Sequence, residues 1–231
     1  MFDKRITIFA GHFGSGKTEV AVNYAIQLKT MKDRVALLDF DIVNPYFRAA
    51  DAAGDLEAKG ISVYLPEYAN LNVESANFPP EVNSVFVDKD IYAVFDVGGD
   101  DLGAKAISRF KKEFLKNEFD FYLVINSRRP MTDTSQKIVD MCLEIKESAG
   151  LAVTGLINNT NILSFTTKET LLEGHDLIAQ ASAELNIPVA FVSGFLPVID
   201  EIDIDGIPKL ILNKYIRLPW EGELNNGISY I

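Results

Sequence analysis

Short apolar runs and longer helix-like segments alternate along the chain. The short runs are apolar at consecutive positions rather than at every second one, which is typical of strands buried on both faces of a parallel sheet. They occupy residues 6–10, 35–39, 61–65, 91–95, 121–125, 153–157 and 189–192. Helical patterns fall between them, at residues 17–29, 103–116, 132–148 and 167–185. The alternation predicts an α/β fold, with a doubly wound, mostly parallel seven- or eight-stranded sheet and helices on both faces.

Two stretches interrupt this rhythm. Residues 66–90 contain two adjacent prolines and little periodicity. A loop of that length is unusual in a compact domain, so we expect a flap-like segment with some local structure. Residues 208–218 mix apolar and basic side chains and suit either an edge strand or a packed helix, and the tail from about residue 213 has no clear assignment. Since no linker or repeat is visible, residues 1–231 are interpreted as one domain.

Composition and charge exclude several classes of protein. The 231 residues include 33 acidic and 22 basic side chains, which gives a formal charge of −11. Nucleic-acid binding is not expected, because phosphate contacts need clustered lysine and arginine. The single cysteine, Cys142, excludes an internal disulfide, and no apolar stretch approaches the roughly 18 residues of a membrane span. We therefore expect a cytoplasmic protein that does not bind membranes.

The first predicted strand leads into a phosphate-binding motif. Residues 11–18, GHFGSGKT, fit the pattern G-x-x-x-x-G-K-[ST] and lie between a strand and a helix, as the motif requires. Glycines let the backbone curl so that several N–H groups face a phosphate, and the helix N-terminus adds partial positive charge. Lys17 is expected to bridge the β- and γ-phosphates, and the Thr18 hydroxyl to hold Mg²⁺. The predicted nucleotide-binding residues are Gly11, His12, Phe13, Gly14, Ser15, Gly16, Lys17 and Thr18.

Carboxylates follow two other predicted strands. Asp39 and Asp41 end the second run, and Asp96 ends the fourth. An aspartate at a strand end often caps a helix or starts a turn. Ligands of an open α/β sheet, however, bind outside the carboxyl ends of its strands, so these side chains should face the phosphate loop. Such an aspartate can hold Mg²⁺ directly or through water, and Gly99 should let a backbone N–H approach the γ-phosphate.

Several segments together resemble the MinD, ParA and nitrogenase iron protein branch of the SIMIBI class of P-loop NTPases. Residues 39–42, DFDI, resemble a segment of MinD, and residues 96–100, DVGGD, resemble a DVLGD segment of the nitrogenase iron protein. The proline-containing loop at 126–130 and the strand end at 155–159 follow in matching order. The resemblance covers roughly residues 4 to 200. It implies an ATPase that forms nucleotide-sandwich homodimers and uses hydrolysis as a conformational switch.

The resemblance also implies roles for individual residues. Asp41 would orient the attacking water and act in catalysis with Lys17. Asp39 would lie near Mg²⁺, which makes Thr18, Asp39 and Asp96 the expected metal ligands. Asn159 would contact the adenine, with the adjacent Asn158 as the alternative.

One departure from this family concerns charge. Its members usually carry a second, signature lysine early in the phosphate loop, which reaches the phosphates bound by the partner subunit. His12 replaces that lysine here, and a neutral histidine supplies no permanent charge. Either His12 substitutes in part, or an arginine such as Arg48, Arg128 or Arg129 does so, or the dimer differs.

Three functions are compatible with these residues. The leading one is a Mg²⁺-dependent ATPase of the MinD/ParA-like class that acts as a switch for an unknown partner. The alternative is an ATP-dependent enzyme of the dethiobiotin synthetase or cobyrinic acid synthase type, which phosphorylates a small carboxylate. A non-catalytic nucleotide-binding module is disfavoured by the intact motif residues. Residues 158–161, NNTN, lack the Lys and Asp of a guanine-reading NKxD tetrad, which favours ATP over GTP.

Overall fold

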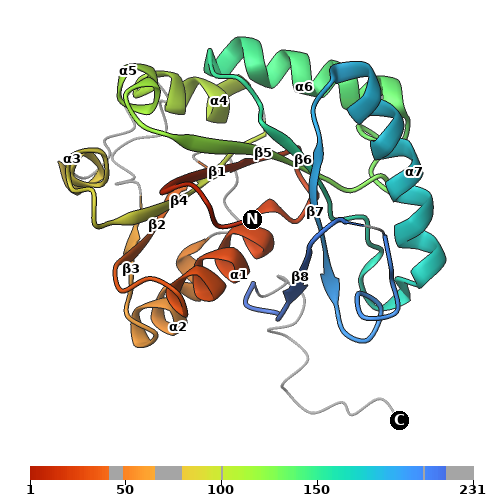
Figure 1. Cartoon of the computed structure of the whole chain (residues 1–231), viewed down its shortest axis with the longest axis horizontal. Helices are drawn as coiled ribbons and strands as arrows, with labels where there is room; N and C mark the ends of the chain where they lie inside the picture. The colour runs from red at the N-terminus through yellow and green to blue at the C-terminus, as the bar shows by residue number, and fades with distance from the viewer. Residues whose placement is uncertain (42–48, 66–79, 100, 205, 217–231) are drawn as a thin grey trace, which may run out of the picture.

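The computed structural model of the protein describes residues 1–41, 49–65, 80–99, 101–204 and 206–216. Within these residues, eight strands form one sheet in the order β3-β2-β4-β1-β5-β6-β7-β8 (Figure 1). Every neighbouring pair is parallel. The strands are β1 (Ile6–Ala10), β2 (Val35–Phe40), β3 (Ile61–Tyr64), β4 (Tyr92–Val97), β5 (Phe119–Ile125), β6 (Gly155–Asn158), β7 (Val189–Phe195) and β8 (Lys209–Leu212). The expected doubly wound α/β fold is confirmed.

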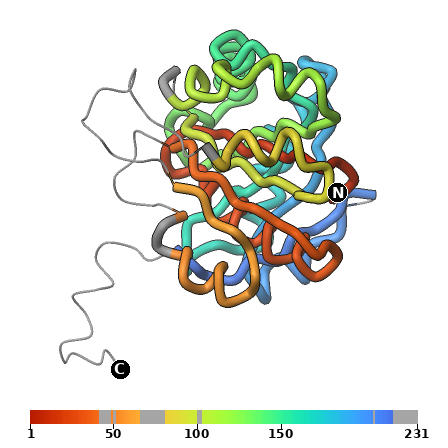
Figure 2. Tube along the Cα trace, turned by 90° about the vertical axis from the view of Figure 1, so that its left-hand side faces the viewer, coloured from red at the N-terminus to blue at the C-terminus, as the bar shows by residue number. Residues whose placement is uncertain are grey.

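Helices cover both faces of this sheet. They are α1 (Lys17–Lys29), α2 (Ala53–Ala58), α3 (Ser84–Val87), α4 (Asp101–Ser108), α5 (Lys111–Leu115), α6 (Ser135–Ala149) and α7 (Lys168–Leu185). Helices α1 and α2 pack on one face and α3 to α7 on the other, and both layers can be followed in Figures 1 and 2. No helix in the described part of the chain is long and apolar enough to span a membrane.

The two-sided burial explains the continuous apolar runs. In β1, Ile6 and Ile8 pack into the core beneath α3 to α7, whereas Phe9 packs into the core beneath α1. In β4, Ala93 and Phe95 face the first core and Val94 the second. Because successive side chains of a strand point to opposite faces, a strand covered on both sides is apolar at most positions. A polar residue there needs a partner, as Thr7 of β1 shows, since its hydroxyl lies 3.2 Å from the Tyr24 hydroxyl.

The helix predicted over residues 103–116 is wrong as a single helix. The structure has α4 and α5 instead, joined by a turn in which the Phe110 N–H donates to the Ile107 carbonyl at 2.9 Å. The break lets the ring of Phe110 pack edge-on against Phe40, with 5.7 Å between ring centroids, and stack on Phe86 at 5.8 Å. Packing of these aromatic rings therefore overrides the local helical periodicity.

The structure describes only parts of the two irregular stretches, residues 66–90 and 208–218. Of the predicted flap at 66–90, residues 66–79 lie outside the described residues. Residues 80–87 form a 3₁₀ turn followed by α3, and Val85 and Phe86 are buried in the core. Of the two alternatives for residues 208–218, the edge strand is the one observed, as β8. Residues 213–216 continue from β8, and the remaining tail lies outside the described part.

Candidate functional site

The phosphate loop joins the carboxyl end of β1 to the start of α1. Gly14 and Gly16 adopt left-handed backbone conformations, with φ of 80° and 81°, which glycine reaches without steric cost. The Ser15 N–H donates to the His12 carbonyl at 3.0 Å and closes the turn. No side chain caps the N-terminus of α1 at Gly16, and the buried Ser15 hydroxyl has no hydrogen-bond partner. The loop therefore offers unsatisfied donors at a helix N-terminus, the arrangement that binds phosphate.

Strand order brings the predicted carboxylates to this loop. Strand β4 lies between β1 and β2, and Asp39 and Asp96 are direct neighbours in the parallel register of β2 and β4. Lys17 contacts Asp41 in a buried ion pair, and the Asp41 N–H donates to Asp39 Oδ1 at 2.9 Å. Thr18 is buried beside Lys17. Lys17, Asp39, Asp41 and Asp96 are each at most 6% exposed, so residues from three strand ends form one buried charged cluster.

Burial and mutual repulsion perturb these carboxylates. The pKa of Asp39 is raised by burial first and by the neighbouring charge of Asp96 second. Burial also raises the pKa of Asp96, against the opposing effect of Lys17. For Lys17, burial alone would lower the pKa, but Asp96, Asp41 and Asp39 together raise it above the usual value. Lys17 is therefore charged at neutral pH, while the ionised forms of Asp39 and Asp96 are destabilised by their surroundings.

The donor atoms of this cluster fit a divalent cation. Asp39 Oδ2 and both carboxylate oxygens of Asp96 are buried without a hydrogen-bond partner. Unpaired buried carboxylate oxygens are costly, and Mg²⁺ prefers such oxygens as ligands. Among the described residues, no group of three or more His, Cys, Asp or Glu side chains is placed to hold a metal ion by itself. The fit is thus to Mg²⁺ held by one or two carboxylates together with Thr18 and phosphate oxygens.

Gly99 lies directly against the phosphate loop. A methyl group added there would be 1.9 Å from the Gly11 carbonyl oxygen and 2.4 Å from the His12 nitrogen. Gly103 makes a similar close approach, since a methyl group added to it would be 2.4 Å from the Gly98 carbonyl oxygen. Only glycine permits these approaches of backbone to backbone. The segment after β4 therefore lies directly against the phosphate loop at Gly11 and His12.

Asn159 is brought to the same loop from the end of β6. Its Nδ2 donates to the Ser15 carbonyl at 2.7 Å, and its Oδ1 accepts from the Ser193 hydroxyl at 3.0 Å. Asn158 instead turns toward α7, where its Nδ2 donates to the Leu171 carbonyl at 3.0 Å. Contact between Asn159 and an adenine stays a prediction. Sequence reasoning missed Ser193, because a serine within an apolar strand gives no local signal of such a role.

Of the three arginines that could replace the charge of the signature lysine, the two that the structure describes make different contacts. Arg128 forms an exposed ion pair with Glu173 of α7. Arg129 lies over the phosphate loop, where its Nε donates to the Gly14 carbonyl at 3.0 Å. Arg48 lies outside the described residues. Of the remaining loop residues, His12 is half-buried and Phe13 is 67% exposed.

A second contact missed by sequence reasoning involves α1 itself. The Glu19 carboxylate, one residue after Thr18, accepts from the backbone N–H groups of Tyr215 and Ile216 at 2.7 and 3.1 Å. Asn23 accepts from the Asn213 N–H at 2.8 Å. Helix α1 therefore joins the phosphate loop to the segment that follows β8.

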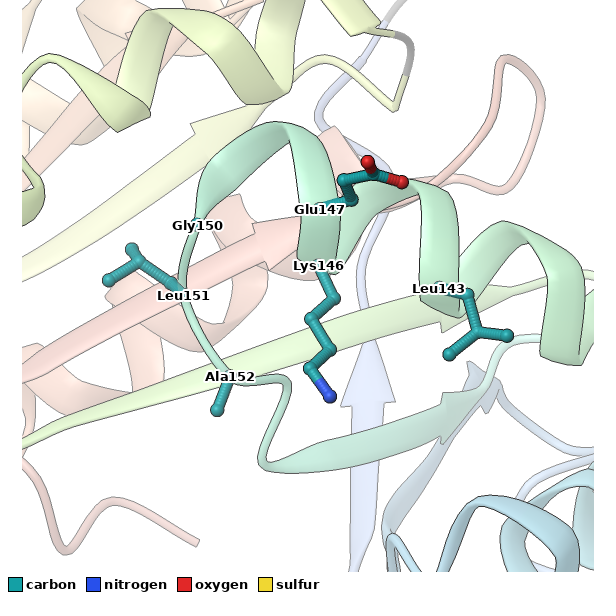
Figure 3. Close-up of a pocket in the computed structure, with 6 residues that line it drawn as sticks. All are labelled: Leu143, Lys146, Glu147, Gly150, Leu151 and Ala152. Atoms are coloured by element: carbon teal, nitrogen blue, oxygen red, sulfur yellow. The ribbon is translucent and has the colours of Figure 1, made fainter.

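A surface hollow lies elsewhere on the molecule. It is lined by the C-terminal end of α6 and the residues that lead into β6 (Figure 3). The labelled side chains include Leu143, Lys146 and Glu147, none of which belongs to the phosphate-loop cluster. The charged cluster is therefore the better candidate site.

Comparison with known proteins supports the fold. No protein-family model matches the sequence, and no curated protein matches it. Among solved structures, cell division protein FtsY from Thermotoga maritima is similar at 22% identity and a TM-score of 0.55, over 81% of this chain and 60% of that one. The signal recognition particle 54 kDa protein from Aeropyrum pernix, in complex with GDP, is similar at 16% identity and a TM-score of 0.52, over 81% of this chain and 40% of that one.

A third similar structure is the signal recognition particle receptor FtsY from Elizabethkingia anophelis in complex with GDP. It shares 18% identity and a TM-score of 0.50, over 81% of this chain and 56% of that one. The chain thus spans about half the length of the structures it matches. At these identities the likeness shows the fold, which is the α/β P-loop NTPase fold.

Proposed function

We propose that this protein is a Mg²⁺-dependent ATPase of the MinD/ParA-like type that acts as a nucleotide-driven switch. The triphosphate occupies the loop at residues 11–18, and Asp39 and Asp96, near the carboxyl ends of β2 and β4, hold and position Mg²⁺. The partner that responds to the nucleotide state is a protein or a small molecule. A homodimer that encloses the nucleotide is part of the proposal.

One observation carries the proposal. A phosphate-binding loop with unsatisfied donors lies beside three buried carboxylates, and three carboxylate oxygens of Asp39 and Asp96 have no hydrogen-bond partner. A cluster of one lysine and three aspartates costs free energy when empty, because the negative charges repel at close range in a poorly solvated site. Such an arrangement is typical of functional sites rather than of stabilising ion pairs.

Lys17, Asp41 and the backbone of the loop have separate roles in the proposed hydrolysis. Lys17 leaves Asp41 and moves to the β- and γ-phosphates, where its charge offsets the charge that develops in the transition state. Asp41, released from Lys17, accepts a hydrogen bond from the attacking water and orients it. Backbone N–H groups of the loop bind the phosphate oxygens. Thr18, Asp39 and Asp96 would hold Mg²⁺, which would supply positive charge at the phosphates.

The choice of ATP rests on the segment after β6. Residues 158–161 lack the Lys and Asp of a guanine-reading tetrad, which favours adenine. GTP is the alternative, since two similar structures are described as complexes with GDP. Competition between ATP and GTP for the same site distinguishes the two nucleotides.

The test is phosphate release from Mg·ATP, with the affinity for ATP measured alongside. Lys17→Ala removes the lysine at the phosphates, and Lys112→Ala changes an exposed lysine of α5 as a matched control. We expect Lys17→Ala to abolish release and tight binding, and Lys112→Ala to match the wild type. Wild-type affinity in Lys17→Ala would refute the site. Release that requires a small carboxylic acid would instead identify the synthetase-type enzyme.

A further inference from the structure

The turn after β5 carries an arginine that lies next to the phosphate loop. The Arg129 N–H donates to the Asn126 carbonyl at 3.1 Å, and the Arg129 carbonyl accepts from the Thr132 N–H at 2.9 Å. The Thr132 hydroxyl also donates to the Asn126 carbonyl, at 2.7 Å, and Asn126 is fully buried. The backbone that carries Arg129 is thus fixed on both sides.

The guanidinium of Arg129 contacts the loop at Gly14. Its Nε donates to the Gly14 carbonyl at 3.0 Å, and a methyl group added to Gly14 would be 2.8 Å from Nε and 3.0 Å from Cζ. A guanidinium carries five N–H donors in a planar fork. Only Nε has a hydrogen-bond acceptor within the described part of the chain, so the two Nη groups remain available to a ligand.

The neighbouring arginine provides a contrast. Arg128 comes from the same turn and is exposed like Arg129, but it pairs with Glu173 of α7. Two adjacent arginines are therefore directed to different parts of the molecule. Only Arg129 contacts the loop that would hold the phosphates.

The negative charge of the cluster means that a bound triphosphate needs additional positive charge nearby. Lys17 carries one positive charge against three from Asp39, Asp41 and Asp96, so the cluster is negative when these groups are ionised. A nucleoside triphosphate brings about four further negative charges, which Mg²⁺ offsets only in part. The Arg129 guanidinium beside the loop supplies further positive charge in the planar geometry that phosphate oxygens favour.

We propose that Arg129 is a phosphate-contacting residue, whose Nη groups bind the terminal phosphate of a nucleoside triphosphate while Nε remains on the Gly14 carbonyl. The inference rests on the proposed function and deepens it. It makes Arg129, within the same chain, a sensor of whether the third phosphate is present. Arg129 thereby favours the triphosphate over the diphosphate.

The experiment compares ATP and ADP binding, each with Mg²⁺, in four proteins by isothermal titration calorimetry. Arg129→Gln removes the charge, Arg129→Lys keeps it without the fork, and Arg128→Gln is the control on the same turn. We expect Arg129→Gln to weaken ATP binding about tenfold or more, as loss of a charge-assisted hydrogen bond predicts, and ADP binding less than about threefold. Arg129→Lys should recover part of the loss, and Arg128→Gln should match the wild type.

Two results would overturn the inference. Unchanged ATP affinity in Arg129→Gln means that the guanidinium contacts no phosphate. Equal weakening of ATP and ADP means that Arg129 only supports the backbone at Gly14. Both results leave the proposed function intact provided that the wild type binds ATP and Lys17→Ala does not. A wild type that binds neither nucleotide would refute the proposed function and the inference with it.

Discussion

The approach of Gly99 to the phosphate loop leads to a sharp prediction for Gly99→Ala. The added methyl group would lie 1.9 Å from the Gly11 carbonyl oxygen and 2.0 Å from the Gly11 carbonyl carbon. Ordinary contact between such atoms is about 3.5 Å, so one of the two backbone segments must move by about 1.5 Å. Both segments belong to the site, and neither can give way as a flexible side chain could.

The expected consequence is a large loss of function with a moderate loss of stability. A misplacement of about 1 Å at a reacting centre can lower the rate about 100-fold, and we expect phosphate release to fall by that factor or more. Overpacking of a core typically costs about 1–3 kcal/mol of unfolding free energy, which leaves a domain of this size folded. ATP affinity should fall in parallel, since the displaced loop carries the phosphate-binding N–H groups.

The assay combines fluorescent ATP titration, phosphate release and urea unfolding. Gly54→Ala serves as the matched control, because Gly54 lies in α2 and a methyl group added there would meet no atom within 4 Å. We expect this control to keep full activity and to gain up to about 1 kcal/mol of stability from the higher helix propensity of alanine. Wild-type ATP affinity and activity in Gly99→Ala would refute the placement of Gly99 against the loop.

Two further predictions concern the buried carboxylates. Asp96→Asn removes a carboxyl group whose pKa is raised by burial, so the free energy of unfolding at pH 8 should rise by about 1–3 kcal/mol. The increase in Tm that Mg·ATP causes in the wild type should disappear in this variant. A Tm increase equal to that of the wild type would contradict a role of Asp96 in metal binding. The raised pKa values of Asp39 and Asp96 mean that the folded state binds more protons than the unfolded state between the ordinary carboxyl pKa, about 4, and the raised values. Stability without ligand should therefore fall as the pH rises through that window. Urea unfolding at pH 5 and pH 8 measures this fall, which should be smaller in Asp96→Asn.

Local sequence was sufficient for much of the fold and for part of the site. Helix α1 has the predicted bounds of 17–29, because a glycine-rich loop and an uninterrupted helical segment are both encoded by neighbouring residues. The strand runs were recognised for the same reason, although β5 begins two residues before the predicted start. The split of residues 103–116 into α4 and α5 was not predictable, because the break depends on rings from β2 and α3 that pack against Phe110.

The sequence by itself determined which chemistry is present: the phosphate loop at 11–18, and the aspartates that end two buried strands. The tertiary structure decided how these residues meet. Asn159 reaches Ser15 across 144 positions and Arg129 reaches Gly14 across 115, because β5 lies beside β1 in the sheet and β6 lies beside β5. Periodicity reports only which face of an element is buried. The order of strands follows from packing of the whole chain, so contacts between distant loops became visible only in the folded molecule.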